Sequence, residues 1–280
     1  NVIHLGEREC SIQRKHQKLL EEAPSAALDD DLRKIMGKIA VQIAKAVKYY
    51  SAGTVEFLLD SEKNFYFMEM NTRIQVEHPV TEIITGIDLI EQQIRIANGE
   101  PLKISQEDIK LEGWAIECRI NAEDVQSGFA PDPGKIEKMN MPADPSIRID
   151  TGVHAGSAIV SSYDSMIAKL IVKGINRKDA IRNCKLALDK VWIKGVKTTL
   201  PFFRMLVRNP KFLDGTFTTA FIEKDLDKYY LNSEYEEMLA AWLATKMFVE
   251  ENLMDNSIPV DFDNSKEMSP WLLNKIINQF

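Results

Sequence analysis

The segment Phe65-Tyr-Phe-Met-Glu-Met-Asn-Thr-Arg-Ile-Gln-Val-Glu-His-Pro79 begins as an apolar strand and ends in acids, an amide, an arginine and a histidine. A strand that only fills a core carries apolar residues at such positions. The polar end of this strand is therefore the first candidate for a functional site.

The residues before this segment predict that it is the second strand of a β-hairpin. Ranges 53–60 and 64–71 are rich in Val, Phe, Tyr and Leu and are separated by a short polar turn. Pairing across that turn places Glu56 directly opposite Glu69. The other predicted pairs are Phe57 with Met68 and Leu59 with Tyr66. A slip of one residue would undo these pairs, so the two glutamates could instead lie on a solvent face.

Two carboxylates that face each other repel unless a proton or a cation neutralises them. Alternation of side chains along the strand puts Asn71 on the same face as Glu69, whereas Phe57 and Met68 point to the other face. An amide oxygen beside two carboxylates suits a hard cation that prefers oxygen ligands. The hairpin therefore predicts a site for Mg²⁺ or Mn²⁺ at Glu56, Glu69 and Asn71.

Composition indicates a globular chain with proper hydrophobic cores. The chain has 280 residues, of which 45% are hydrophobic, and its formal net charge is −7. This mildly acidic balance argues against a surface that coats nucleic acid. No apolar run has the length of a membrane span. Neither nucleic acid nor membrane is expected as a partner.

The cysteines favour a reducing compartment, and the first residues suggest that the protein begins upstream of Asn1. Cys10, Cys118 and Cys184 are far apart and form no CxxC pair, which favours free thiols in a reducing compartment. The sequence begins without Met in what we predict to be a strand. We therefore expect the protein to extend further toward its N-terminus.

Apolar periodicity predicts an α+β protein in which a helical, strand-containing first part precedes a largely antiparallel second part. Predicted helices cover 28–50, from Asp88 to about Gly99, 177–191 and 200–208, and predicted strands cover 113–122, 146–151 and 166–173. A change of pattern after Pro101 places the first domain at 1–104 and the second at 105–225. The acidic segment 226–280 is expected to be a helical tail that packs on the domain or on a partner.

A basic cluster follows the first residues and comprises Arg8, Arg14, Lys15, His16 and Lys18. Such a cluster in a loop can hold an anion such as phosphate or bicarbonate. Taken alone, such a cluster is more often a solvated surface, so the cluster alone assigns no function.

Several segments together resemble one family, the biotin carboxylases, which are ATP-grasp enzymes. The matching pieces are residues 7–18, Glu22-Ala-Pro24, Gly53-Thr-Val-Glu-Phe57, residues 68–82, Glu117-Cys-Arg-Ile-Asn-Ala-Glu123 and Tyr163-Asp-Ser-Met166. They occur in family order from Asn1 to about Lys224, and the long one is very specific. The resemblance implies the C-terminal portion of an ATP-grasp domain, a biotin carboxylase C-terminal α+β domain and the helical tail.

The resemblance also implies roles for individual residues. Glu56 and Glu69 would bind the Mg²⁺ of Mg-ATP with help from Asn71. The implied nucleotide neighbours are Gln13, His16 and Leu58. The implied bicarbonate and phosphate residues are Lys18, Arg73, Gln75 and the backbone of Val76. Glu77 would be the general base, and Arg148 the cation that stabilises bicarbonate and the biotin enolate.

These residue types suit the chemistry that the resemblance implies. ATP would convert bicarbonate, a poor electrophile, to carboxyphosphate, while the metal and basic groups neutralise crowded oxygens. The carboxyl group would then pass to biotin on a carrier protein. The implied cofactors and substrates are Mg²⁺ or Mn²⁺, ATP and biotin, and the implied partners are a biotin carboxyl carrier protein, a carboxyltransferase and a second copy in a homodimer. The implied location is the cytoplasm, or the mitochondrial matrix in a eukaryote.

One feature of the sequence and two alternative functions stand beside this interpretation. No glycine-rich phosphate-covering loop is present, so we expect the chain to be inactive alone. Another bicarbonate-using ATP-grasp ligase, such as half of a carbamoyl-phosphate synthetase, shares the fold, although the Arg73–Pro79 run favours the biotin enzyme. The chain could also be a non-catalytic assembly fragment whose tail binds other subunits.

Overall fold

A computed structural model describes residues 1–224, 242, 245 and 246 of the chain. The chain divides into two compact units, Asn1–Leu231 and Asn232–Phe280, and the fold given below is that of the first. Its helices are α1 (Asp30–Ala46), α2 (His78–Thr85), α3 (Leu89–Ala97), α4 (Arg177–Lys190), α5 (Leu200–Leu206), α6 (Pro210–Asp214), α7 (Phe221–Lys224) and the 3₁₀ turn η1 (Gln106–Asp108). Its longer strands are β1 (Glu9–Arg14), β2 (Gln17–Ala23), β3 (Thr54–Leu59), β4 (Phe65–Asn71), β5 (Trp114–Asn121), β10 (Ile147–Thr151) and β12 (Met166–Gly174). Short strands are β6 (Glu123–Asp124), β7 (Ala130–Pro131), β8 (Gly134–Lys135), β9 (Lys138–Asn140), β11 (Ala158–Ile159) and β13 (Trp192–Lys194).

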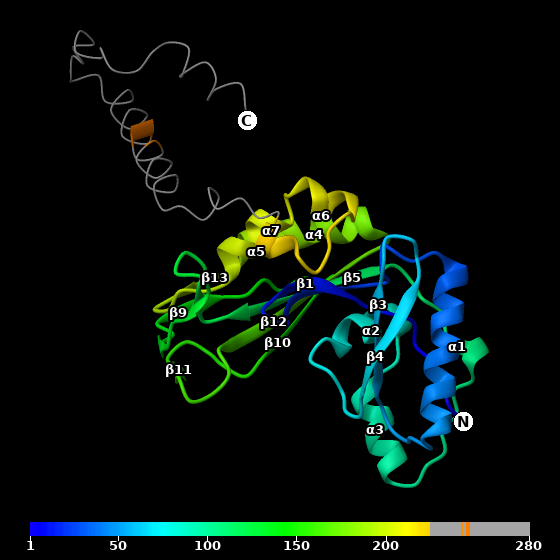
Figure 1. Cartoon of the computed structure of the whole chain (residues 1–280). Coiled ribbons are helices and arrows are strands. Elements are labelled where there is room, and N and C mark those ends of the chain that lie inside the picture. Colours follow the sequence, from blue (N-terminus) through cyan, green and yellow to red (C-terminus); the bar gives the residue numbers. More distant parts are fainter. Residues whose placement is uncertain (225–241, 243–244, 247–280) are drawn as a thin grey trace, which may run out of the picture. The chain divides into compact units, whose positions relative to one another are not determined.

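An antiparallel five-stranded sheet with the order β1-β2-β5-β12-β10 forms the centre of this unit. Helices α4 to α7 lie on one side of it in Figure 1, whereas α2 packs against β2, β5 and β12. Alternation along β5 explains both layers, because Ile116 and Cys118 join the core cluster that includes α4, and Ala115 joins the cluster that includes α2. Glu117 and Arg119 therefore point to the same side as α2. This confirms the predicted α+β class.

The predicted hairpin is confirmed, and Glu56 pairs with Glu69 as expected. The two predicted pairs nearer the turn are wrong by one residue, because Phe57 faces Phe67 and Leu59 faces Phe65. A β-bulge at Met68 gives β4 one extra residue and shifts by one the register of the pairs between the bulge and the turn.

Two elements near the start of the chain differ from expectation. No strand forms at residues 1–8, where His4 instead exchanges hydrogen bonds with the Gln106 side chain at 2.9 and 3.0 Å. The basic segment that was expected to be a loop is the β1–β2 hairpin, and its turn residues Lys15 and His16 have φ values of 48° and 64°. Positive φ at both turn positions matches the twist of a tight hairpin.

Helix α2 was not predicted. It begins at His78 directly after the polar segment, has a proline in its first turn and ends at Gly86 with φ 70°. Proline at the start and glycine just past the end are ordinary helix boundaries. The short length of the helix, eight residues, hid its apolar periodicity.

The remaining predicted helices form, with shorter bounds than expected. Asp29 caps α1, Asp88 caps α3 and Asn176 caps α4, each through a side-chain hydrogen bond to the backbone. Helix α1 packs only partly, since none of its residues is buried. The predicted tail helices lie outside the described residues. Among the described residues, no helix has the length and apolar character that crossing a membrane requires.

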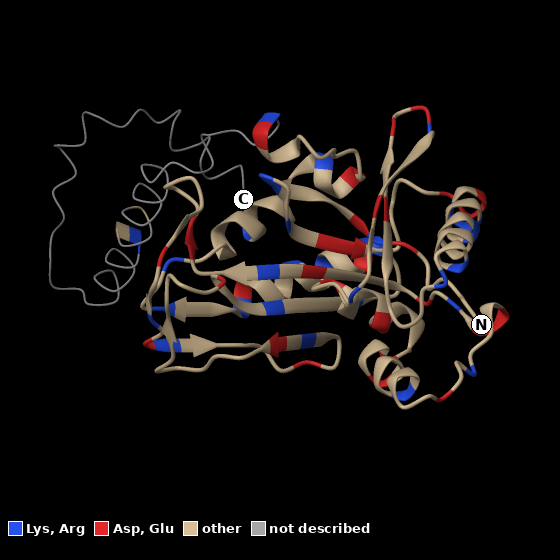
Figure 2. Cartoon of the chain, turned by 60° about the horizontal axis from the view of Figure 1, so that its bottom comes forward, with Lys and Arg blue, Asp and Glu red and all other residues tan. Residues whose placement is uncertain are grey.

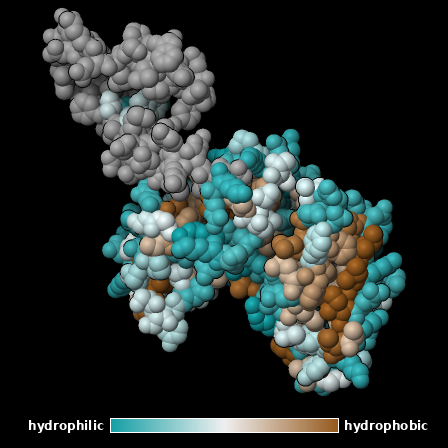
Figure 3. All heavy atoms as spheres, in the orientation of Figure 1, coloured by the Kyte–Doolittle hydropathy of each residue, from teal (hydrophilic) through white to brown (hydrophobic). Residues whose placement is uncertain are grey.

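The hairpin and α1 carry many exposed apolar side chains, which appear as the brown and tan area over these elements in Figure 3. The exposed ones are Ile35, Val47, Leu58, Tyr66, Phe67 and Met68. Of these, Leu58 and Met68 line a hollow of about 1650 Å³ that α1, β3 and the first residues of the chain also line. No described residue fills it.

Candidate active site

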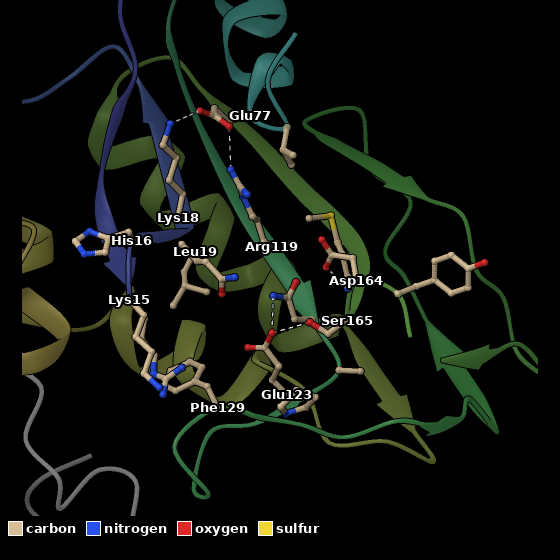
Figure 4. Close-up of a pocket in the computed structure, with 18 of the residues that line it drawn as sticks. Lys15, His16, Lys18, Leu19, Glu77, Arg119, Glu123, Phe129, Asp164 and Ser165 are labelled. Atoms are coloured by element: carbon tan, nitrogen blue, oxygen red, sulfur yellow. Dashed lines mark hydrogen bonds and ion pairs between the residues drawn. The ribbon is translucent and has the colours of Figure 1, made fainter. Parts of the chain in front are cut away.

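A buried carboxylate, Glu77, lies where the polar segment enters α2. It is 2% exposed and occupies the position just before the first residue of the helix. Lys18 Nζ on β2 donates to its Oε1 at 2.8 Å, and Arg119 Nη2 on β5 donates to its Oε2 at 2.9 Å. Figure 4 shows the two cations approaching Glu77 from the sheet strands, each joined to it by a dashed line. Two strands and one helix therefore fix one carboxylate.

The surrounding charges keep Glu77 ionised. Burial by itself would raise the pKa of Glu77, but the positive charges of Arg8 and Lys18 outweigh it, so this pKa lies below its ordinary value. Burial likewise opposes the charge on Lys18, but its acidic neighbours reverse this effect and raise the pKa of Lys18. The pair is a lysinium beside a carboxylate at neutral pH. Figure 2 shows bands of both charges within the strands of this region.

Lys18 links Glu77 to the hairpin carboxylates. The same Nζ donates to Glu56 Oε1 at 2.8 Å. Gln75 Nε2 donates to this oxygen at 2.6 Å, and Asn71 Nδ2 donates to it at 3.2 Å. Asn71 also donates to Glu69 Oε1 at 2.9 Å, which confirms that Asn71, Glu56 and Glu69 share a face. Donors of the chain itself thus hold the facing carboxylates together.

Arg8 supports the same cluster from the segment before β1. Its guanidinium donates to Thr54 and Thr81, each at 3.1 Å, and to the Gln75 side-chain oxygen. Its Nη2 lies 3.9 Å from Glu77 Oε1. These contacts join the hairpin, α2 and the polar segment through one side chain.

A pocket of about 900 Å³ opens over this cluster. Of the predicted site residues, those that line it are His16, Lys18, Glu56, Glu69, Asn71, Arg73, Gln75, Val76 and Glu77. Its opposite wall comes from two other segments of the resemblance, since Ser165 Oγ donates to Glu123 Oε1 at 2.6 Å and Asn121 Nδ2 donates to the same oxygen at 3.0 Å. The fold therefore brings separate segments of the sequence to one cavity.

Gln13 and Leu58 do not line this pocket, whereas Arg73 and Val76 line it and also form other contacts. Gln13 and Leu58 line the larger hollow beside α1, where Leu58 is 48% exposed. Arg73 is exposed, and its side chain donates to the carbonyl oxygen of Ile74 at 3.1 Å. The carbonyl of Val76 accepts from Lys169 Nζ at 3.1 Å, which ties the polar segment to β12.

Arg148 does not reach the pocket. Its guanidinium donates to Asp150 at 2.8 and 3.0 Å and to Glu82 Oε2 at 2.6 Å, and it lines neither cavity. The arginine that the structure places in hydrogen-bond contact with Glu77 is Arg119, while Arg8 lies 3.9 Å away. The sequence contained a signal for it, because alternation along 113–122 puts Arg119 on the polar face of its strand. The partner strands and α2 that complete its surroundings come from other parts of the chain.

The donor set at the hairpin fits a divalent cation only in part. Glu56 and Glu69 offer hard oxygen ligands, as Mg²⁺ and Mn²⁺ require. No group of three or more His, Cys, Asp or Glu side chains capable of holding a metal ion occurs among the described residues. The two carboxylates therefore suit an ion that takes further oxygens from a bound phosphate, as Mg²⁺ commonly does.

Comparison with known proteins gives a consistent family. Residues 1–105 match the model for the carbamoyl-phosphate synthase L chain, ATP binding domain, and residues 117–224 match the model for the biotin carboxylase C-terminal domain. The chain is 55% identical over 224 residues to a biotin carboxylase of Nostoc sp., covering 80% of this chain and 50% of that relative. It is 54% identical over 224 residues to biotin carboxylase 1 of Bacillus subtilis, with the same coverage.

A solved structure agrees with these relatives. The biotin carboxylase domain dimer of Hydrogenobacter thermophilus 2-oxoglutarate carboxylase, described in complex with MgADP, ADP and bicarbonate, is similar with a TM-score of 0.81 and 50% identity. The match covers 83% of this chain and 51% of that chain. The chain thus spans about half the length of the relatives it matches.

Proposed function

Because this chain belongs to the biotin carboxylase family, we propose that it forms part of an enzyme that carboxylates biotin with bicarbonate and ATP. The observation that carries the proposal is the Glu77 carboxylate, which is buried and held between Lys18 and Arg119. Glu56 and Glu69 lie next to it through Lys18. A fixed base beside cations and a metal-binding carboxylate pair is what activation of bicarbonate by a nucleotide requires.

Glu77 acts as the general base in this proposal. It takes the proton of bicarbonate, and the bicarbonate oxygen attacks the γ-phosphorus of ATP. The bond from that phosphorus to the β,γ-bridging oxygen breaks, so ADP leaves with the electron pair and carboxyphosphate forms. The lowered pKa of Glu77 keeps it free of a proton before the reaction.

The remaining groups bind and orient the oxyanions. Lys18 and Arg119 place two positive charges at Glu77, where negative charge develops on bicarbonate and on the biotin ureido oxygen. Arg73, Gln75 and the backbone of Val76 line the same pocket. Arg119 is the cation that geometry favours for biotin, in the role that the resemblance gave to Arg148.

Glu56 and Glu69 would hold Mg²⁺ or Mn²⁺, with Asn71 beside them. When bound, the ion supplies positive charge to the triphosphate oxygens. The hydrogen bonds that Glu56 accepts from Lys18 and Gln75 fix its carboxylate for that purpose.

We further infer partners from the same proposal. Biotin would arrive on a carrier protein, and a carboxyltransferase would use the product. The Hydrogenobacter domain is described as a dimer, which supports a homodimer here. Sedimentation of the chain at increasing concentration tests the dimer, and a monomer at all concentrations would contradict it.

The expected location is the cytoplasm or the mitochondrial matrix.

Two alternatives receive less support. The ATP-binding model over residues 1–105 is named for carbamoyl-phosphate synthase, but residues 117–224 match the biotin carboxylase C-terminal domain. The assembly-fragment alternative gives no role to Glu77, an ionised and buried carboxylate that lines the pocket. Bicarbonate-dependent ADP release therefore distinguishes the proposal from the assembly fragment.

The function can be tested with a chimera in which this chain replaces the matching 224 residues of the Bacillus subtilis relative. We expect the chimera to release ADP in a bicarbonate- and biotin-dependent manner. We expect the 280-residue chain alone to release none, since the hollow beside α1 is open and lined by exposed apolar side chains. Turnover by the chain alone would refute the second expectation, and an inactive but folded chimera would refute the proposed function.

Replacing both hairpin carboxylates tests the metal site. In the chimera, Glu56→Gln with Glu69→Gln should raise the Mg²⁺ concentration for half-maximal ADP release by at least about tenfold, because two charged oxygen ligands are lost. The same change should weaken Mn²⁺ binding measured by electron paramagnetic resonance in the presence of ADP. Glu62→Gln, in the exposed turn of the same hairpin, is the matched control and should change neither. An unchanged Mn²⁺ affinity would place the metal elsewhere.

A further inference from the structure

Behind Arg119 lies a second pair of facing carboxylates that the proposed mechanism does not use. Glu21 on β2 and Glu117 on β5 are direct partners in the sheet register. Both side chains are 0% exposed. Among the described residues, none of their four carboxylate oxygens has a hydrogen-bond partner. A strand pair that needed only stability would not bury two such groups.

The pair contacts the active site through one side chain. Arg119 Nη2 forms ion pairs with Glu21 on one side and with Glu77 Oε2 on the other. The contact with Glu21 is close but lacks hydrogen-bond geometry, and Arg119 Nε also has no hydrogen-bond partner among the described residues. The orientation of the guanidinium therefore depends on the charges that flank it.

We propose that Glu21 and Glu117 act as one acid pair, which holds a single proton and a single negative charge, and that this pair positions the Arg119 guanidinium against Glu77. Two carboxylates that face each other in a buried strand pair do not both ionise at neutral pH. One charge suffices to balance one side of the guanidinium while Glu77 balances the other. The inference rests on the proposed function only for its effect on turnover.

The burial of the two carboxyl groups favours their protonated forms, in agreement with this geometry. Burial is the main cause that raises the pKa of Glu21 to about 7, with the charge of Glu77 adding to it and that of Arg119 opposing it. Burial followed by the charge of Glu21 raises the pKa of Glu117 well above its ordinary value. The charged or titratable groups near the pair are Cys10 on β1, Lys18 on β2, Glu77 before α2, Arg119 on β5 and Lys169 on β12, whereas the Cys118 thiol lies on the opposite face of β5.

A single proton has a direct structural consequence. A protonated Glu117 can donate its O–H toward Glu21, which leaves the charge on the carboxylate that contacts Arg119. Glutamine at 117 reproduces the protonated partner in size and in hydrogen-bonding capacity. Glutamine at 21 removes the charge that contacts Arg119. The two substitutions are chemically identical and differ only in which member of the pair loses its carboxyl group.

Infrared spectroscopy of the full 280-residue chain tests the proton. At about pH 6, ordinary glutamates are ionised. We expect the carbonyl stretch of one protonated, buried carboxylic acid in the wild-type chain, persisting through neutral pH and fading only at more alkaline pH. Glu117→Gln should abolish it. A wild-type spectrum without this band, or a band unaffected by Glu117→Gln, would overturn the proposal, and the wild-type titration needs no variant to fold.

Nuclear magnetic resonance of the arginine side chains tests the positioning in the same chain. Rotation of the Arg119 guanidinium should be restricted in the wild type and in Glu117→Gln and should become fast in Glu21→Gln. Equal rotation in all three would refute the positioning role. Thermal unfolding confirms that each variant is folded.

Steady-state kinetics of the chimera test whether the acid pair affects turnover through Arg119. Glu21→Gln should lower kcat/KM about 10- to 100-fold, and it should add little to the loss caused by Arg119→Ala, since residues that act through each other are not additive. Glu117→Gln should stay within about threefold of the wild type. Additive losses from Glu21→Gln and Arg119→Ala would contradict the proposal. An inactive wild-type chimera would refute the proposed function and leave the spectroscopic tests decisive.

Discussion

Replacing Glu77 by glutamine is expected to reduce bicarbonate-dependent ADP release by the chimera about 10²- to 10⁴-fold, the range that a positioned general base contributes. Glutamine keeps the size of the side chain and can still hydrogen-bond, but it cannot take a proton from bicarbonate. The loss should appear in kcat rather than in KM for ATP. Steady-state assays of ADP release measure both quantities.

The ionisation of Glu77 makes this test interpretable at neutral pH. Burial favours the protonated form, but Arg8 and Lys18 keep the pKa below its reference value of 4.5. A lowered folded-state pKa contributes stability that is present above the unfolded pKa and is lost as the pH falls through the folded one. At neutral pH Glu77 in the wild type is therefore an ionised carboxylate, and the assay compares it with the amide of glutamine.

Glu82→Gln is the matched control for Glu77→Gln. Glu82 lies on α2, which begins directly after Glu77, and also forms an ion pair, with Arg148 at 2.6 Å, but it does not line the pocket. We expect the activity of Glu82→Gln to remain within about threefold of the wild type, because Glu82 does not line the pocket and its ion-pair partner Arg148 is partly exposed. Activity of Glu77→Gln above one tenth of the wild type would reject Glu77 as the base.

Arg119→Ala and Arg148→Ala should differ sharply in the same chimera. Arg119→Ala removes the cation 2.9 Å from Glu77 and should lower biotin-dependent turnover at least about 100-fold, as loss of a preorganised charge does in other sites. Arg148→Ala should cost less than about tenfold, because its guanidinium is committed to Glu82 and Asp150. Both variants are assayed with free biotin.

A charge-preserving change separates electrostatics from packing at Arg119. Arg119→Lys keeps a positive charge but cannot bridge Glu21 and Glu77 as the planar guanidinium does. We expect it to recover part of the loss seen in Arg119→Ala. If Arg148→Ala were the more damaging of the two alanine variants, the role implied by the resemblance would return to Arg148.

Some of the site could be predicted from the sequence because it depends on local rules. Strand composition and a short turn were enough to pair Glu56 with Glu69, and alternation put Asn71 beside them. The bulge at Met68 shifted the pairs beyond it, since a bulge leaves no clear mark in composition. The shared face of Glu56, Glu69 and Asn71 is unaffected because the bulge lies between Glu69 and the hairpin turn.

Other contacts could not be predicted because they join distant segments. Lys18 and Glu77 are 59 positions apart, and Arg119 and Glu77 are 42 apart. No periodicity within one segment specifies which strand lies next to another. The β1–β2 hairpin, expected to be a loop, supplies Lys18 to the pocket only through its place beside β5.

The sequence alone determined the class of fold, the family that its motifs resemble and the facing pair Glu56 and Glu69, since these follow from composition, alternation and motif order. Only the tertiary structure decided which arginine meets Glu77. Arg119 and Arg148 both lie on strands of one sheet, and their neighbours differ because β5 lies against β2 whereas β10 lies at the edge. A side chain's chemistry is set by the groups that packing brings to it, and for these two arginines those groups come from other strands and from α2.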